Sequence, residues 1–349
     1  GGISRYFVNL FLNLNLKKID YKVFVPFFKN EYLKDVNKEN INGKYLNYLF
    51  PYSSFLFKKY NEVISSKKII EWNPNLIHYT YYYEKLKKSD KPTIITIYDL
   101  IHEKKSILNG TPVFPKKRMV DIADHIISIS QKTKEDLIEI YGVEEKKISV
   151  IYLGADHSLI NNFDLSQNVK IFSQPYILFI GSRAKYKNFP FFLESYANSN
   201  KLLNKFEIIL FGGGNLTVEE KKIINKLGIK ENLIKQINGN DNLLVNLYKN
   251  AELFVFPSLD EGFGIPIIES FINKCPVICS DIPVFREIAQ NSVNYFDPKE
   301  IESLSEVMEN TILSSNEKNT LKEKGYAQSK KYTWEKCTEE TLSVYKKFL

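Results

Sequence analysis

The sequence predicts an α/β protein in which parallel strands are covered by helices on both faces. Short continuous apolar runs alternate along the chain with segments of helical periodicity, as they do when both faces of a sheet are buried. The composition, 44% hydrophobic and 26% charged residues, is that of a globular protein and excludes a disordered chain. A length of 349 residues favours two domains, since one domain has roughly 100–200 residues.

Five apolar runs predict strands in the first half of the chain. They are YKVFV (21–25), NLIHY (75–79), PTIITI (92–97), HIISIS (125–130) and ISVIYL (148–153). One helix is predicted at 4–15. A second is predicted at 133–141, where Thr133 and Asp136 form a start signal and Gly142 a stop signal.

Residues 154–175 are polar and lack periodicity, which predicts an interdomain linker. A second series of strands is expected after it, at 176–181, 206–211, 233–237, 253–257 and 276–280. Helix starts in this half are indicated by Asn188, by Thr217 with Glu220, and by Asp241. Three further helices are expected at about 298–313, 316–330 and 333–348.

The charge is distributed unevenly. Residues 1–118 hold 21 Lys and Arg against 10 Asp and Glu, whereas residues 171–349 hold 22 of each sign. An excess of this kind suits a polyanion or an anionic membrane as partner, and a lysine-rich surface without a partner is the alternative. The three cysteines, an odd number, favour a reducing cytosol over a disulfide framework.

The segment LFVFPSLDEGFGIPIIESF (253–271) carries the strongest functional signal. A buried strand is expected to end at Pro257, and a glycine-containing loop with Glu261 leads into a helix that contains Glu269. Ligands of open α/β sheets bind beyond the carboxyl ends of the strands, where this loop is expected. The two carboxylates can accept hydrogen bonds from the hydroxyls of a ribose or a hexose. The alternative is that Glu261 is solvated and Glu269 only complements the helix dipole.

This segment resembles GT-B glycosyltransferases of the family-4 type, in which E-x7-E lies between an F-x-F-P-S strand and a PVI-x-S strand. The resemblance covers nearly the whole chain. Other matching segments are GGISRY (1–6), SISQKTKEDL (128–137), VIYLGAD (150–156), YILFIGSRAKYKN (176–188) and YTWEKCTEETLSVY (332–345).

The resemblance implies two Rossmann-like domains facing across a cleft. Residues 1–165 would form the acceptor-side domain and residues 166–331 the nucleotide-sugar domain. A C-terminal helix, 332–349, would cross back to the first domain.

The resemblance also implies roles for the residues that match the family pattern. Glu269 would hold the nucleotide ribose and Glu261 the hydroxyls of the donor sugar. Arg183 and Lys187 would neutralise the donor diphosphate, which agrees with their place after a buried strand at the same edge as Glu261. The remaining donor-binding candidates, which lie in the two glycine-containing segments and can supply backbone amides, are Gly2, Gly262, Phe263, Gly264 and Ile265.

The first domain departs from the family pattern in two ways. Many relatives have a histidine after the TIITI-like strand, where this chain has Tyr98 and Asp99, with His102 further on. Asp99 and His102 are therefore the candidates for catalytic contacts on the acceptor side, and structural hydrogen bonding at a strand end is the alternative. In addition, relatives have a strand before the glycine-rich segment that opens this chain. Either that strand is missing here, or the sheet is built without it.

The reaction implied by the resemblance is retaining glycosyl transfer. The SR-x-x-YKN and YDLIHE segments look most like bacterial mannosyltransferases of surface-polysaccharide assembly, which favours GDP-mannose over the UDP-sugars that use the same frame. No D-x-D triplet occurs, so metal-independent transfer without a cofactor is expected.

The expected partners are the nucleotide-sugar donor, a glycan or lipid-linked acceptor and an anionic membrane surface, but no nucleic acid. The expected location is the cytoplasm, with peripheral attachment to the inner face of the plasma membrane. Two other functions stay open: a non-catalytic nucleotide-sugar-binding subunit, and an NAD-dependent dehydrogenase, which the missing G-x-G-x-x-G fingerprint disfavours.

Overall fold

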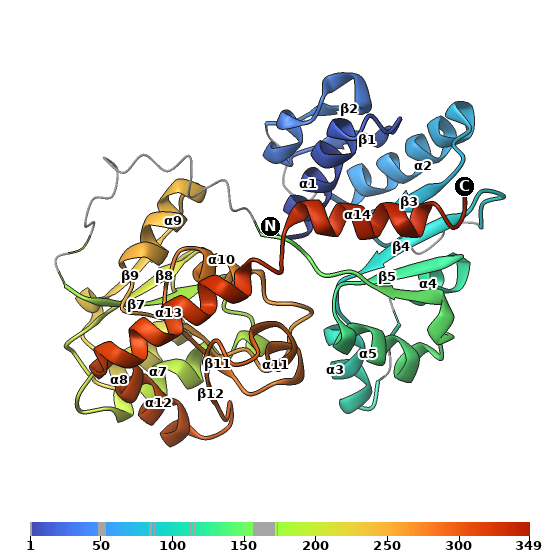
Figure 1. The fold of residues 1–349 in the computed structure, drawn as a ribbon. Coiled ribbons are helices and arrows are strands. Elements are labelled where there is room, and N and C mark those ends of the chain that lie inside the picture. The colour runs from blue at the N-terminus through green and yellow to red at the C-terminus, as the bar shows by residue number, and fades with distance from the viewer. Residues whose placement is uncertain are drawn as a thin grey trace. The chain divides into compact units, whose positions relative to one another are not determined.

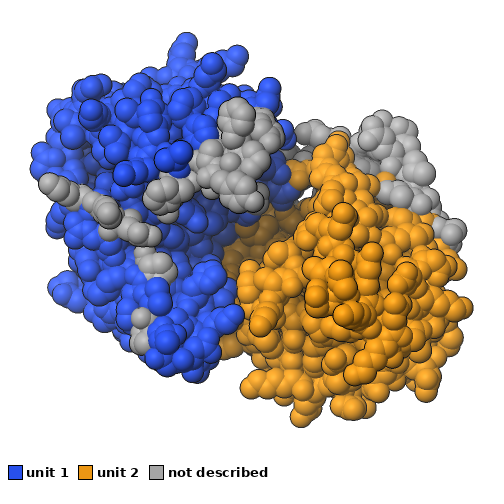
Figure 2. Space-filling view, turned by 180° about the vertical axis from the view of Figure 1, so that it is seen from behind, with its two compact units in different colours: residues 1–154, 334–349 blue, residues 155–333 orange. Residues whose placement is uncertain are grey.

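The computed structural model describes residues 2–47, 54–83, 86, 88–111, 113–114, 116–155, 172 and 174–349. The chain forms two compact units, coloured separately in Figure 2. Unit 1 comprises Gly1–Gly154 and Trp334–Leu349, and unit 2 comprises Ala155–Thr333. Most of the expected linker, 154–175, lies outside the described residues.

The described residues of unit 2 form a six-stranded sheet in which every strand pairs in parallel with its neighbours. Its strands are β7 (Tyr176–Ile180), β8 (Glu207–Phe211), β9 (Ile234–Ile237), β10 (Leu253–Phe256), β11 (Val277–Ser280) and β12 (Asn294–Phe296). Their order is β12-β11-β10-β7-β8-β9, so the direction of strand addition reverses between β7 and β10. Ligands of open α/β sheets bind at such a switch point, beyond the carboxyl ends of the strands.

Helices surround this sheet (Figure 1). They are α7 (Phe189–Asn198), α8 (Val218–Lys226), α9 (Asp241–Asn250), α10 (Ile265–Ile272), α11 (Pro283–Ala289), α12 (Ile301–Leu313) and α13 (Ser315–Ser329), with 3-10 turns η5 (Lys185–Lys187) and η6 (Glu231–Leu233). The core between sheet and helices contains fully buried Phe192, Leu210 and Leu304. Burial of such side chains stabilises each by about 1.5–3 kcal/mol relative to exposure.

The helix starts predicted in unit 2 have different outcomes. Thr217 and Glu220 form the expected capping box at α8. Helix α9 begins at Asp241, but the cap is the preceding Asn240, whose side chain accepts a hydrogen bond from the Leu243 amide. Asn188 precedes α7 without capping it, because its backbone is left-handed and its amide group donates to the Pro298 carbonyl instead.

Unit 1 contains two parallel sheets among its described residues. One has the order β3-β4-β5-β6 and the other pairs β1 with β2. The strands are β1 (Val23–Phe28), β2 (Ile41–Tyr45), β3 (Ile77–Tyr79), β4 (Thr93–Ile97), β5 (His125–Ser128) and β6 (Ile148–Val150). Strands β1 and β3, one from each sheet, line a cavity of about 460 Å³.

The helices of unit 1 include one formed by the end of the chain. They are α1 (Gly2–Leu16), α2 (Ser54–Trp72), α3 (Ile101–Leu108), α4 (Lys117–Ile122), α5 (Gln131–Tyr141) and α14 (Trp334–Tyr345), with 3-10 turns η1 (Glu31–Asp35), η2 (Lys38–Asn40) and η3 (Glu145–Lys147). The predicted start of α5 at Thr133 is wrong, because Ser130 caps this helix by accepting a hydrogen bond from the Thr133 amide. The predicted stop is confirmed, since Gly142 takes the left-handed C-cap conformation with φ 66°.

Helix α14 packs against α1 within unit 1 (Figure 1). The rings of Tyr6 and Trp334 stack with their centroids 6.2 Å apart. The Lys17 ammonium lies 3.1 Å from a carboxylate oxygen of Glu339. The Tyr345 hydroxyl lies 2.6 Å from Nδ1 of His78 at strand β3. The C-terminal helix therefore completes the fold of the unit that the start of the chain begins.

Candidate active site

Lys187 and Glu261 form an ion pair at the switch point of the unit 2 sheet. Lys187 ends the turn η5 that follows β7, and Glu261 lies in the loop that follows β10. Because β7 and β10 are neighbouring parallel strands, their carboxyl ends bring the two loops together. The Lys187 Nζ atom lies 2.5 Å from Oε1 of Glu261, and each side chain is 13% exposed.

Aromatic rings hold the Lys187 ammonium from other sides. It lies 5.0 Å from the ring centroid of Phe256 and 5.3 Å from that of Tyr186. The backbone links the same two loops, because the Leu259 amide donates to the Tyr186 carbonyl at 2.7 Å. The pair thus presents a fixed cation, suited to phosphate, next to a carboxylate, suited to hydroxyl groups.

Glu269 lies on α10, one helical turn beyond the same loop, and is half-buried. One of its oxygens, Oε2, is 3.2 Å from the hydroxyl of Tyr248, a buried residue of α9. The same hydroxyl lies 3.1 Å from the Pro266 carbonyl. This contact is not predictable from the sequence, because the i, i+4 spacing of Leu244 and Tyr248 predicts an inward helix face but not a hydrogen-bond partner.

The loop before α10 has a backbone that suits close approach. Gly262 and Phe263 are buried, and Ile265 is the first helical residue. Gly264 is the N-cap with φ 114°, and a Cβ atom there would lie 3.3 Å from the Phe285 ring. A side chain at this position is therefore strained as well as crowded. Amides at the start of a helix lack intrahelical acceptors and can donate to an anion.

Arg183 is held by other groups of unit 2. Its Nε donates to Glu220 at 2.7 Å, and Nη2 donates to the Gly214 and Asn215 carbonyls at 2.9 and 2.8 Å. Its side chain is only 4% exposed. Gly212, Gly213 and Gly214 all have positive φ, so the guanidinium braces a turn that glycine alone adopts readily. Glu220 serves both this contact and the α8 cap.

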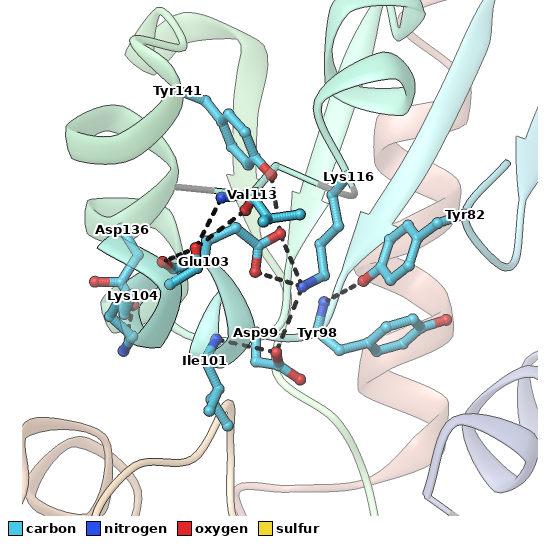
Figure 3. Close-up of polar contacts among 11 residues, drawn as sticks. Tyr82, Tyr98, Asp99, Ile101, Glu103, Lys104, Val113, Lys116, Asp136 and Tyr141 are labelled. Atoms are coloured by element: carbon cyan, nitrogen blue, oxygen red, sulfur yellow. Dashed lines mark hydrogen bonds and ion pairs between the residues drawn. The ribbon is translucent and has the colours of Figure 1, made fainter. Parts of the chain in front are cut away.

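The remaining candidates, Gly2, Asp99 and His102, belong to unit 1. Gly2 is the exposed first residue of α1, and His102 is exposed in the first turn of α3. Asp99 follows β4, and its Oδ1 accepts a hydrogen bond from the Ile101 amide at 3.2 Å (Figure 3). Asp99 thus does form the kind of structural hydrogen bond that the sequence left as the alternative, while its side chain stays 33% exposed.

Cys275 and Cys279 are buried, and burial raises the pKa of both thiols. In the part of the chain that the structure describes, no three His, Cys, Asp or Glu side chains gather as a metal site would require.

Within the described residues, no helix combines the length and the apolarity that crossing a bilayer requires.

Family models match both halves of the chain. Residues 1–159 match the model described as Glycosyltransferase Family 4, and residues 162–328 match Glycosyl transferases group 1. This chain belongs to the GT-B glycosyltransferases. The α/β fold class and the resemblance on which the sequence prediction rested are confirmed, and the family does not favour a dehydrogenase.

Solved glycosyltransferases share the fold of this GT-B chain. Anabaena HepE, solved in complex with UDP and glucose, is similar with a TM-score of 0.75 and 15% identity, covering 99% of this chain and 96% of that one. WaaG, a glycosyltransferase involved in lipopolysaccharide biosynthesis, has a TM-score of 0.75 and 12% identity with the same coverage.

Curated relatives of this GT-B chain include two mannosyltransferases. The O-antigen chain mannosyltransferase RfbU of Salmonella typhimurium is 31% identical over 200 residues, which is 56% of this chain and 53% of the relative. The O-antigen chain mannosyltransferase B of Escherichia coli is 25% identical over 65% of this chain and 61% of the relative. The chain therefore spans between half and two thirds of the length of these relatives.

Proposed function

We propose that the protein is a retaining hexosyltransferase that moves mannose from GDP-mannose to a glycan or lipid-linked acceptor in surface-polysaccharide biosynthesis. The observation that carries this proposal is the Lys187–Glu261 pair at the switch point of the unit 2 sheet, with Glu269 on the adjoining helix. The names of the two mannosyltransferase relatives support the donor sugar.

In this proposal each charged group of the site meets one part of the donor. Glu269 accepts hydrogen bonds from the ribose hydroxyls, and Glu261 accepts them from the hydroxyls of the sugar. Lys187 contacts the diphosphate, where the amide at the start of α10 adds a donor. Arg183, which the turn 212–215 and Glu220 hold, reaches the diphosphate only if it exchanges these contacts.

The proposed reaction needs no enzyme nucleophile. The bond between the anomeric carbon and the phosphate oxygen breaks, and the departing diphosphate takes the electron pair. An acceptor hydroxyl forms the new glycosidic bond on the same face of the sugar and gives its proton to the diphosphate. The protein positions the reactants and stabilises the leaving group, most strongly through Lys187.

Thermal shifts with GDP-, UDP-, ADP- and dTDP-sugars test the proposed donor. GDP-mannose is expected to give the largest shift, because a ligand at 100 times its dissociation constant stabilises a protein by about 2.7 kcal/mol. A larger shift with another nucleotide would refute the donor. Binding of GDP-mannose without turnover on any acceptor would indicate the non-catalytic subunit.

Removal of divalent cations is expected to leave transfer unchanged, because Lys187 and backbone amides supply the positive groups that face the diphosphate. The measurement is the rate of GDP release with and without EDTA. Loss of activity that added Mg²⁺ restores would contradict the proposed metal independence.

We extend the proposal to the membrane: the protein binds an anionic membrane surface on the cytoplasmic side, where a lipid-linked acceptor would be presented to it. The support is helix α2, on which four exposed apolar side chains recur at helical spacing: Leu56, Tyr60, Val63 and Ile70. Exposed Lys59 and Lys67 lie on the same helix. Exposed apolar side chains on a helix can insert into a membrane interface, and basic residues beside them are attracted to anionic lipids.

The basic residues that adjoin one another within residues 1–118 contribute unequally to this surface. Lys116 is buried and pairs with Glu103, so its charge does not face solvent. Lys17 and Lys117 pair with carboxylates of unit 1. The side chains of Phe55 and Lys58, and residues Lys85 and Lys87, lie outside the described part of the chain.

Sedimentation with vesicles tests the membrane surface. Ile70→Glu is expected to lower binding to anionic vesicles several-fold, since it places a repelled charge on the α2 face. Val218→Glu is the matched control, because Val218 is a similarly exposed apolar residue of unit 2. Equal binding to neutral and anionic lipid, or binding that salt leaves unchanged, would refute the membrane surface.

A further inference from the structure

A buried ion pair lies next to Asp99, the residue that follows strand β4 by two positions (Figure 3). Lys116, which precedes α4, places its Nζ atom 2.9 and 3.1 Å from the two carboxylate oxygens of Glu103 on α3. The Glu103 side chain is 0% exposed and the Lys116 side chain 5%. The Tyr141 hydroxyl donates to Oε1 of Glu103 at 2.9 Å, and burial of Tyr141 beside Glu103 raises the pKa of this hydroxyl. Both oxygens of Glu103 are therefore occupied.

The same ammonium also faces Asp99. Its Nζ atom lies 3.6 Å from Oδ1 of Asp99, the oxygen that accepts the Ile101 amide hydrogen bond. The Tyr82 ring lies on another side of Lys116, with its centroid 5.4 Å from Nζ. Asp99 is thus held at one oxygen by a buried cation and a backbone amide.

The second carboxylate oxygen of Asp99 is turned away from this cluster in Figure 3. Among the described residues, Oδ2 of Asp99 has no hydrogen-bond partner. Asp99 follows the buried strand β4, at the carboxyl edge of the unit 1 sheet, where open α/β sheets bind their ligands. A carboxylate oxygen fixed in this way can accept a hydrogen bond from a hydroxyl.

Stability alone does not account for such an arrangement. A buried ion pair often adds little to stability, because desolvation offsets the attraction between the charges. Glu103 already accepts a hydrogen bond from Tyr141, and the lysine that compensates its charge is placed so that it also meets a half-exposed aspartate.

We infer that Lys116 is a positioning residue that acts through Asp99, whose outward oxygen Oδ2 accepts a hydrogen bond from a hydroxyl of the sugar acceptor. Glu103 and Tyr141 hold Lys116 in place and do not touch the acceptor. This inference rests on the proposed function, because it assigns the acceptor contact of the same reaction.

The test replaces the pair without leaving a buried charge. Lys116→Met alone would leave the Glu103 carboxylate buried without its compensating cation, which can unfold unit 1. The variant is therefore the double substitution Glu103→Gln with Lys116→Met. Lys104→Met is the matched control: Lys104 lies on the same helix α3, and its partner Asp136 keeps a second lysine, Lys132. The circular dichroism spectrum and the affinity for GDP are expected to be the same for the parent, the double variant and the Lys104→Met control.

The assay measures GDP release from GDP-mannose with n-octyl glycosides of mannose, galactose and N-acetylglucosamine as acceptor probes. For the glycoside that the parent uses best, the double variant is expected to raise the acceptor KM about tenfold with the donor KM within about twofold. The control is expected to match the parent. An acceptor KM in the double variant equal to that of the control would overturn the inference.

A second measurement separates positioning from general structural damage. If Lys116 acts through Asp99, adding the double substitution to Asp99→Asn changes the acceptor KM little beyond the effect of Asp99→Asn alone. Fully additive effects would overturn the inference. A parent that binds GDP but shows no glycoside-dependent GDP release would instead refute the proposed function, which keeps the two failures distinct.

Discussion

Glu269→Gln is expected to weaken GDP binding about 10- to 100-fold. The substitution keeps the shape of the side chain but removes the charge that strengthens hydrogen bonds to the ribose hydroxyls, and a hydrogen bond to a charged group contributes about 1.5–3 kcal/mol. The Tyr248 hydroxyl can still donate to the remaining side-chain oxygen, so the variant is expected to fold. Titration calorimetry with GDP and with UDP measures the effect.

Glu252→Gln is the control for this measurement. Glu252 lies before β10, at the opposite edge of the same sheet, and pairs with Lys318. Glu252→Gln changes the charge of unit 2 by the same amount as Glu269→Gln, but Glu252 is remote from the proposed ribose contact. If both variants bind GDP as the parent does, Glu269 is not the ribose ligand.

Lys187→Ala is expected to lower kcat about 100-fold or more at saturating GDP-mannose. The ammonium meets the diphosphate most strongly as negative charge develops on the leaving group, so catalysis suffers more than donor binding. The variant also removes the cation that pairs with the Glu261 carboxylate, whose side chain is only 13% exposed, and a lower melting temperature is therefore expected. Initial rates at saturating donor give kcat, and circular dichroism verifies the fold.

Lys185→Ala provides the comparison for this variant. Lys185 opens the same 3-10 turn, is exposed, and carries the same charge. A kcat for Lys187→Ala close to that of Lys185→Ala would remove Lys187 from the mechanism.

The fold was predictable where burial is complete. Strand β4 is buried at each of its five residues, and a continuous apolar run such as TIITI is the direct record of that environment in the sequence. Helix α2 was not predicted because its outward face is apolar too, so Leu56 and Ile70 obscure the periodicity that marks one buried face. Strand β2 reads INGKY and is half-exposed, which leaves no run of apolar residues.

The sequence predicts which charged side chains of the site lie at one edge of the sheet, because the ends of the strands and the residue types can be read from it. Glu261 and Lys187 were expected at one sheet edge, and neighbouring strands bring them together. The contacts of Arg183 were not foreseen, because one carboxylate, Glu220, serves two partners with its two oxygens. The burial of Lys116 depends on how the chain turns between α3 and α4, whereas in the sequence this lysine is only the first of three consecutive basic residues, Lys116, Lys117 and Arg118.

The packing of α14 on α1 also affects how the protein is made. The ribosome synthesises unit 1 in two parts, because all of unit 2 lies between them in the sequence. Unit 2 has all of its residues and can fold while Tyr6 still lacks Trp334, and His78 still lacks Tyr345. The earlier part of unit 1 therefore carries exposed aromatic surface until α14 has been synthesised, and it is the part that a chaperone would shield.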